Sequence, residues 1–222
     1  GVGNFVYEYH YWWPQYRDFG LFGFCENLYK DIRGYKANLH LDENLMPVAG
    51  IKKGGKVAIL AGCGPMGLVA IDIALHGKTK PSMVVVTDLD QARLDRAASI
   101  FSAEKAKEDG IELIFSNTSD KDELIALSGG TGFDDVFVYA PVSAVVELGD
   151  AILGFDGSLN FFAGPLDKKF SANLNFYNVH YAQHHVVGTS GSTTDEASPV
   201  TACLCDLHLR LLGTTQGRFG RG

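Results

Sequence analysis

The stretch that decides the predicted fold is Lys56-Val-Ala-Ile-Leu-Ala-Gly-Cys-Gly-Pro-Met-Gly-Leu-Val-Ala-Ile71. It places a G-x-G-x-x-G pattern between a short apolar run and a segment with apolar residues at helical spacing. In such a strand–turn–helix unit, Gly62 allows the tight turn, Gly64 lets the backbone approach a pyrophosphate, and Gly67 allows close helix packing. The amide groups at the helix start then face the phosphates. The stretch therefore predicts a dinucleotide-binding unit.

The alternation of short apolar runs and helical segments continues from Lys53 to Ser190. This alternation is typical of a parallel sheet with crossover helices. Strands are expected at 56–60, 83–87, 111–115, 135–139, 158–162 and 185–188, and helices at 66–75, 91–109, 121–127 and 142–153. We therefore predict an α/β fold of the Rossmann type, a doubly wound sheet of six parallel strands.

An acidic residue stands where the second predicted strand ends. Asp88 lies 21 residues after Gly67, the spacing expected for the acid that accepts hydrogen bonds from the adenosine ribose. A carboxylate at this place repels a 2′-phosphate, so the sequence predicts NAD in preference to NADP. The simpler interpretation is a glycine-rich turn beside a surface aspartate.

An alternative interpretation of the glycine loop is that the protein is an S-adenosylmethionine-dependent methyltransferase, because Gly62-Cys-Gly64-Pro also resembles the glycine loop of that class. Methyltransferases usually carry an acid two residues before the first glycine, where this sequence has Leu60, and a Gly-x-Gly-x-Gly loop, where it has Met66 and then Gly67. These two differences favour the dinucleotide interpretation.

The composition excludes some classes of function. The chain has 222 residues with a formal net charge of -7 and no cluster of lysine and arginine, so nucleic-acid binding by charge is not expected. Glycines and Asp72 interrupt the most apolar stretch, 57–75, so no membrane span is expected. The sequence starts without the pattern of a signal peptide, and its four cysteines are few for a disulfide framework. The cytoplasm is the expected location.

Longer segments resemble a known family. The segments 49–71 and 88–97 are similar to the cofactor domain of the medium-chain dehydrogenase/reductase superfamily, in particular the zinc-type alcohol and polyol dehydrogenases. The segments 129–142, 157–165 and 175–191 resemble the branch of sorbitol dehydrogenase, threonine dehydrogenase and L-sorbose 1-phosphate reductase. The resemblance spans about residues 28–195. It implies an NAD(P)-dependent oxidoreductase that transfers hydride reversibly between NAD and a secondary alcohol of a polyol, sugar or sugar phosphate.

The resemblance also extends the expected cofactor site. Pro65 and Met66 match loop positions at the pyrophosphate and the nicotinamide ribose, and Arg93 matches a position beside the adenine. Further matches lie at the ends of later strands, on the adenosine side at Ala140 and Val142, and near the nicotinamide at Ala163, Gly164, Thr189 and Ser190. Each of these strand-end residues has packing within the sheet as its alternative role.

The resemblance implies zinc, but the zinc motifs of the family are not found in this sequence. The candidate ligands His180, His184 and His185 precede or begin a strand, and Cys203 and Cys205 are closer than the usual zinc pair, so neither group is assigned a metal. A non-catalytic dinucleotide-binding module therefore stays open as an alternative to the enzyme.

The expected domain organisation has three parts. Residues 1–50 are expected to be a remnant of a mainly β, GroES-like catalytic domain, 51–190 the Rossmann domain that binds NAD, and 191–222 a tail without assignment. The family resemblance implies a homodimer or homotetramer that acts on a small polyol or sugar.

Overall fold

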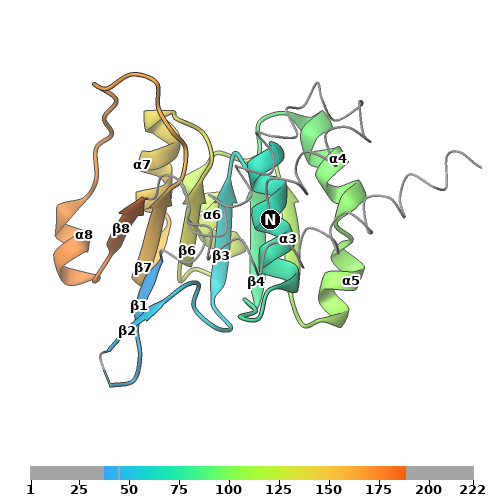
Figure 1. Cartoon of the computed structure of the whole chain (residues 1–222), viewed down its shortest axis with the longest axis horizontal. Coiled ribbons are helices and arrows are strands. Elements are labelled where there is room, and N and C mark those ends of the chain that lie inside the picture. Colours follow the sequence, from blue (N-terminus) through green and yellow to red (C-terminus); the bar gives the residue numbers. More distant parts are fainter. Residues whose placement is uncertain (1–37, 45, 189–222) are drawn as a thin grey trace, which may run out of the picture. The chain divides into compact units, whose positions relative to one another are not determined.

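The computed structural model describes residues 38–44 and 46–188. Its main feature is a sheet of six parallel strands in the order β5-β4-β3-β6-β7-β8 (Figure 1). The strands are β3 (Lys56–Leu60), β4 (Met83–Thr87), β5 (Glu112–Ser116), β6 (Phe133–Val138), β7 (Leu153–Phe161) and β8 (His185–Gly188). The helices are α3 (Pro65–His76), α4 (Gln91–Ile100), α5 (Ala103–Glu108), α6 (Lys121–Leu127), α7 (Ser143–Ala151) and α8 (Phe176–Tyr181). The predicted Rossmann fold is confirmed.

The strand order contains one reversal of direction. The chain runs outward from β3 through β4 to β5, then returns to the other side of β3 and runs outward through β6 and β7 to β8. The crevice at the carboxyl ends of β3 and β6 is therefore the topological switch point, where open α/β sheets bind their ligands.

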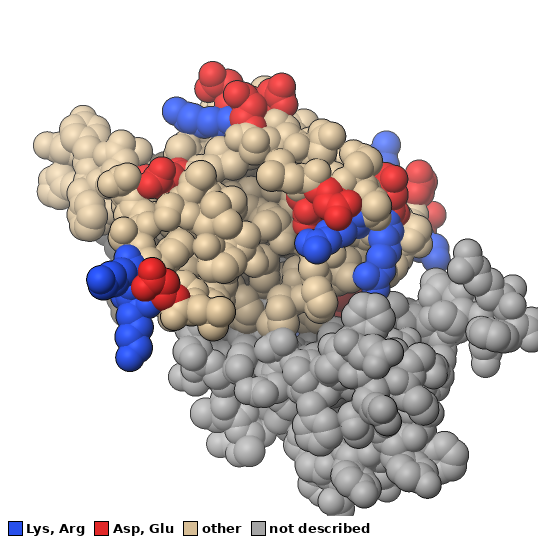
Figure 2. All heavy atoms as spheres, turned by 90° about the horizontal axis from the view of Figure 1, so that it is seen from above, with Lys and Arg blue, Asp and Glu red and all other residues tan. Residues whose placement is uncertain are grey.

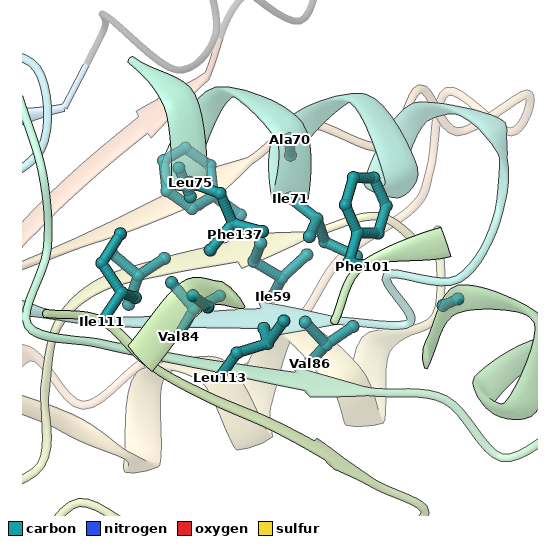
Figure 3. Close-up of a cluster of buried hydrophobic side chains, with 14 of the residues drawn as sticks. Ile59, Ala70, Ile71, Leu75, Val84, Val86, Phe101, Ile111, Leu113 and Phe137 are labelled. Carbon is teal, nitrogen blue, oxygen red and sulfur yellow. The ribbon is translucent and has the colours of Figure 1, made fainter. Parts of the chain in front are cut away.

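Both faces of the central sheet are covered by helices, as expected for parallel strands with few polar residues. One apolar cluster joins β3, β4 and β5 to α3, α4 and α5, and Figure 3 shows its side chains between the first of these helices and the sheet. A second cluster joins β3, β4, β6 and β7 to α6 and α7 on the opposite face. Ile59 and Leu60 point to opposite faces and are both fully buried.

The expected helix at 91–109 is in fact two helices, α4 and α5. Phe101 is extended and buried between them, and Ser102 caps α5 by accepting a hydrogen bond from the Lys105 amide (3.2 Å). The strand expected at 158–162 begins earlier, at Leu153, after a shorter α7. A register shift against β6 and a positive φ of 57° at Asp156 accompany this longer strand.

A short antiparallel hairpin precedes the sheet. It consists of β1 (Leu39–Leu41) and β2 (Pro47–Ala49), and β1 contacts β7 through the hydroxyl of Ser158, which accepts from the Leu39 amide (3.1 Å) and donates to the Leu39 carbonyl (2.7 Å). Mainly β structure was expected for residues 1–50, and the part of it that the structure describes, 38–44 and 46–50, contains these two short strands.

The surface of the described residues carries mixed charge. On the face that Figure 2 shows, acidic and basic side chains lie together in separate groups, with uncharged surface between them. None of the described helices is long and apolar enough to cross a membrane.

Candidate dinucleotide site

The glycine loop between β3 and α3 begins with a sharp turn. Ala61 has a positive φ of 53°, and the amide of Gly62 donates to the carbonyl of Thr87 on β4 (2.8 Å). A Cβ atom on Gly62 would lie 2.5 Å from Cγ2 of Ile59, which is closer than real Cβ contacts. The turn predicted for Gly62 is therefore tight enough to require a residue without a side chain.

The other two glycines of the pattern differ from each other. A Cβ on Gly67 would lie 2.0 Å from the carbonyl oxygen of Gly62, so α3 packs directly on the loop backbone. A Cβ on Gly64 would meet no atom within 4 Å. Gly67 is thus required by packing within the protein, whereas Gly64 leaves the loop backbone open to a bound group.

The first turn of α3 has the properties of an anion site. Gly64 is the N-cap residue and forms no side-chain capping bond, Pro65 occupies the first helical positions, and no acidic residue lies in the first turn. The leading amides of this 12-residue helix are therefore not capped by a side chain, and the positive end of the helix dipole favours phosphate. Met66 lies in the same turn.

Asp88 lies directly beside this loop. Its Oδ2 accepts a hydrogen bond from the Cys63 amide (3.3 Å), and its Oδ1 accepts from the Asp90 amide (3.1 Å). The side chain is largely buried at the end of β4. The sequence predicts that Asp88, 21 positions after Gly67, acts together with the glycine loop. In the structure, Asp88 contacts this loop directly through the Cys63 amide.

Cys63 lies inside the loop but is unsuited to nucleophilic chemistry. Burial, followed by the negative charge of Asp88, raises the pKa of its thiol to about 12. The thiol is therefore neutral at physiological pH, and its side chain belongs to the apolar cluster under α3.

The other predicted residues that the structure describes lie along the same carboxyl edge. Arg93 is exposed at the start of α4, with its Nε 3.5 Å from Oδ2 of Asp90. Ala140 and Val142 follow β6, and Val142 is 50% exposed. Ala163 and Gly164 follow β7, where the Ala163 amide donates to the Val138 carbonyl (3.1 Å) and a Cβ on Gly164 would meet nothing within 4 Å. Thr189 and Ser190 lie outside the described residues.

Leu89 is an exposed apolar residue at this edge that the sequence motif does not single out. It follows Asp88 directly, and its side chain is 79% exposed, although an apolar side chain gains free energy by burial. Val142, which follows β6 on the other side of β3, is a further exposed apolar side chain at this edge. The signal that could have found Leu89 is an apolar residue immediately after the strand-end acid, in a loop where polar residues are usual.

The candidate metal ligands that the structure describes, His180, His184 and His185, do not form a metal site. Among residues 38–44 and 46–188, no three histidine, cysteine, aspartate or glutamate side chains are grouped so that they could hold a metal ion. His185 instead contacts Asp156, with its Nε2 2.7 Å from Oδ1, and burial lowers the pKa of His184. Cys203 and Cys205 lie outside the described residues. The described part of the chain therefore does not fit the zinc that the resemblance implies.

Comparison with known proteins adds three curated relatives. The chain is 53% identical over 151 residues to mannitol-1-phosphate 5-dehydrogenase of Aliivibrio fischeri, covering 66% of this chain and 36% of that protein. It is 47% identical over 174 residues to L-sorbose 1-phosphate reductase of Klebsiella pneumoniae, covering 78% and 42%. It is 49% identical over 176 residues to the uncharacterized protein YggP of Escherichia coli K12, covering 77% and 41%. No family model matches the chain.

Solved structures share the fold. The 2R,3R-butanediol dehydrogenase of Bacillus subtilis matches with a TM-score of 0.56 and 20% identity, over 82% of this chain and 44% of that one. A zinc-binding dehydrogenase of Sinorhizobium meliloti, bound to NADP, also matches with a TM-score of 0.56 and 20% identity, over 78% and 45%. The predicted resemblance is confirmed in sequence for L-sorbose 1-phosphate reductase and in fold for the zinc-type alcohol dehydrogenases.

The matches are partial in a consistent way. The chain spans between 36% and 42% of the length of these curated relatives. It is related in sequence to sugar-phosphate dehydrogenases and has the cofactor-domain fold of zinc-type alcohol dehydrogenases.

Proposed function

We propose that this chain binds NAD and serves a reversible hydride transfer between NAD and a secondary alcohol of a polyol, sugar or sugar phosphate. The observation that carries the proposal is the hydrogen bond between the Cys63 amide and the Asp88 carboxylate. It brings an acid suited to the ribose beside a helix start suited to the pyrophosphate, at the switch point of a doubly wound sheet.

In this proposal, each part of the cofactor has its own binding residues. The pyrophosphate would lie over Gly64 and the start of α3 at Pro65 and Met66, and Asp88 would accept hydrogen bonds from the adenosine ribose. The exposed apolar surfaces of Leu89 and Val142, with Arg93 nearby in sequence, would cover the flat faces of the adenine. Ala163, Gly164, Thr189 and Ser190 would lie toward the nicotinamide, with Ala140 on the adenosine side. When bound, NAD supplies the hydride acceptor, and the protein holds and orients it.

NAD is proposed in preference to NADP because of charge. The Asp88 carboxylate would repel the 2′-phosphate of NADP, because like charges at close range repel each other. The S. meliloti neighbour holds NADP, but at 20% identity it supports the fold alone.

The substrate class and the assembly belong to the same proposal. Two curated relatives are named for mannitol 1-phosphate and L-sorbose 1-phosphate, which supports a phosphorylated polyol or sugar as substrate. We extend the proposal to a cytoplasmic homodimer or homotetramer, to a cofactor domain at 51–190, and to a remnant of the substrate domain at 1–50. Zinc enters only through the resemblance, so no step of the transfer is derived from it.

The proposal is tested by titrating the purified full chain with NADH, NADPH and S-adenosylmethionine and following protein fluorescence. Saturable binding of NADH that is tighter than binding of NADPH, with no response to S-adenosylmethionine, is expected. Binding of S-adenosylmethionine in place of NADH would instead establish the methyltransferase interpretation. NADH binding without oxidation of mannitol 1-phosphate or sorbitol would leave a non-catalytic module.

A further inference from the structure

A network of acidic and basic side chains in contact with one another lies away from the dinucleotide site and links four strands. Asp135 on β6 contacts His40 on β1, with Oδ1 2.8 Å from Nε2. Asp156 on β7 follows, with its carbonyl oxygen 2.9 Å from Nδ1 of His40 and its Oδ2 3.8 Å from the same atom. His185 on β8 is the last member of this network, with its Nε2 2.7 Å from Oδ1 of Asp156.

Within this network, we infer that Asp135 is an ionised carboxylate, from the groups that surround it. It has no exposed surface, and the two groups of fixed role that face its oxygens are both donors. The Asn38 amide group donates to Oδ1 (2.7 Å), the Lys52 backbone amide donates to Oδ2 (2.9 Å), and His40 approaches Oδ1. A protonated carboxyl would place a proton against one of these donors. The buried charge therefore requires a positive partner.

His40 supplies that positive charge. One of its ring nitrogens faces a backbone carbonyl, which only accepts, and the other faces the ionised Asp135, which also only accepts. Both nitrogens must donate, and only an imidazolium does so. Burial by itself lowers the pKa of His40, but the hydrogen bond and charge of Asp135, with the carbonyl and charge of Asp156, raise the pKa above its ordinary value of 6.5.

The hairpin β1–β2 is attached to the sheet by polar contacts around this pair. The Leu41 amide donates to Oδ2 of Asp156 (3.0 Å), and Asn160 on β7 donates to the side-chain oxygen of Asn38 (2.7 Å). The apolar side chains of the hairpin contribute little, because Leu39, Met46 and Val48 are all exposed. The attachment therefore depends on hydrogen bonds and on one buried ion pair.

We propose that the imidazolium of His40 is a pH-dependent clamp that fastens the β1–β2 hairpin to β6 and β7 and releases it on losing its proton. The charged groups that face His40 are Asp135 from β6 and Asp156 from β7, with His185 from β8 acting through Asp156. The ammonium of Lys52, on the segment after the hairpin, is paired with Asp134 instead (2.6 Å). The clamp does not depend on the proposed cofactor.

The direction of the pH effect follows from the charges. When His40 is neutral, Asp135 is left as a buried charge without a counter-charge, and one ring nitrogen loses the proton that it donates. Hydration of Asp135 requires that the hairpin lift away from the sheet. The hairpin is therefore fastened at low pH and released as the pH rises through the pKa of His40.

The test uses the full chain and two measurements. The histidine side chains are titrated by NMR, with His40 assigned through His40→Gln, and amide exchange of residues 38–49 is followed by mass spectrometry from about pH 5 to about pH 9, a range that brackets ordinary histidine pKa values. Exchange is corrected for its intrinsic pH dependence. His180→Gln is the matched control, because His180 is an exposed histidine on α8 outside this network.

The clamp predicts that His40 titrates above 6.5 and that corrected hairpin exchange rises about tenfold for each pH unit by which its pKa is raised. His180→Gln keeps this rise and His40→Gln removes it. At high pH the hairpin should exchange faster than β3. Titration of His40 at or below 6.5, exchange without a pH dependence, or equal exchange of hairpin and β3 would each overturn the clamp. If His40→Gln does not fold, the wild-type measurements decide.

Discussion

One face of the sheet is stabilised differently in its two halves, the half formed by β3, β4 and β5 and the half formed by β6, β7 and β8. Over β3, β4 and β5 this face carries Val57, Ile59, Val84 and Val86, packed under α3, α4 and α5. Over β6, β7 and β8 the strand partners of Val57 are Asp135, then Ser158, then His185, and the β1–β2 hairpin lies on them. The first half depends on apolar burial, whereas the second depends on a buried polar layer joined by hydrogen bonds. Non-directional packing tolerates small changes, but a buried polar layer fails when one partner is lost.

The largest effect is expected from removing the central charge of the polar half. Asp135→Asn removes the carboxylate that lies 2.8 Å from the His40 imidazolium and leaves only the more distant Asp156 (3.8 Å) as a counter-charge, so the free energy of unfolding should fall by about 3–5 kcal/mol, measured by urea denaturation. Asp134→Asn is the matched control at the neighbouring residue, where the ion pair with Lys52 is partly exposed, and should cost less than about 1 kcal/mol. Similar losses in the two variants would show that the polar half is not specially dependent on Asp135.

A second variant pair tests the apolar half at the glycine loop. Gly67→Ala places a Cβ 2.0 Å from the Gly62 carbonyl, so it should destabilise the protein by about 1–3 kcal/mol or more and prevent NADH binding. Gly64→Ala meets open space, so thermal unfolding should change little while NADH binding weakens. Equal destabilisation by the two variants would contradict the different roles given to these glycines.

The polar half also predicts a pH dependence. Because the pKa of His40 is raised in the folded state, its contribution is complete below 6.5 and is lost as the pH rises through the folded pKa. The loss is about 1.4 kcal/mol for each unit by which the pKa is raised. His184, whose pKa is lowered, acts in the opposite direction and below 6.5, and the Cys63 thiol acts only above its ordinary value of 9.0.

Between pH 6.5 and pH 9.0, the urea midpoint of the wild type should fall as the pH rises, whereas the midpoint of His40→Gln should stay level. A wild-type stability that is level or rises above the ordinary histidine pKa would contradict a protonated His40.

The smallest effect concerns a polar group that the apolar half needs. Asp90 caps α4 by accepting from the Ala92 and Arg93 amides (2.9 and 3.3 Å), so Asp90→Ala should lower the free energy of unfolding by about 1 kcal/mol. The control Asp95→Ala removes an exposed contact with Gln91 on the same helix and should cost less than about 0.5 kcal/mol. Thermal unfolding followed by circular dichroism measures both, and a larger loss for Asp95→Ala would exclude the cap.

The comparison also explains what the sequence could predict. The apolar half has its information in local patterns, so the strands 56–60 and 83–87, the glycine loop and Asp88 were all found from spacing. The polar half joins residues that are far apart, since His40 and Asp135 are separated by 95 positions and Asn38 and Asn160 by 122. No periodicity marks such pairs. His40, between Leu39 and Leu41, even reverses the usual alternation by burying the polar residue.

The predicted dinucleotide site lies at the carboxyl ends of the parallel strands, which meet at one edge of the sheet. Gly62, Gly64, Gly67 and Asp88 are predicted from the motif, whereas Arg93, Ala140, Val142, Ala163 and Gly164 are predicted only from the resemblance, and the cofactor roles of all of them stay predictions. Leu89 is not predicted by the motif, because only the structure shows that its side chain is exposed.

The most direct test of the account is the ratio of the dissociation constants for NADPH and NADH in Asp88→Asn, with Asp90→Asn as control, measured by fluorescence titration of the full chain. Removal of the Asp88 charge should weaken NADH binding and reduce the preference for NADH by about tenfold or more, since about 1.4 kcal/mol of charge repulsion corresponds to tenfold. Asp90→Asn should leave the ratio near the wild-type value. An unchanged ratio in Asp88→Asn would contradict a dinucleotide site built on Asp88 and the glycine loop.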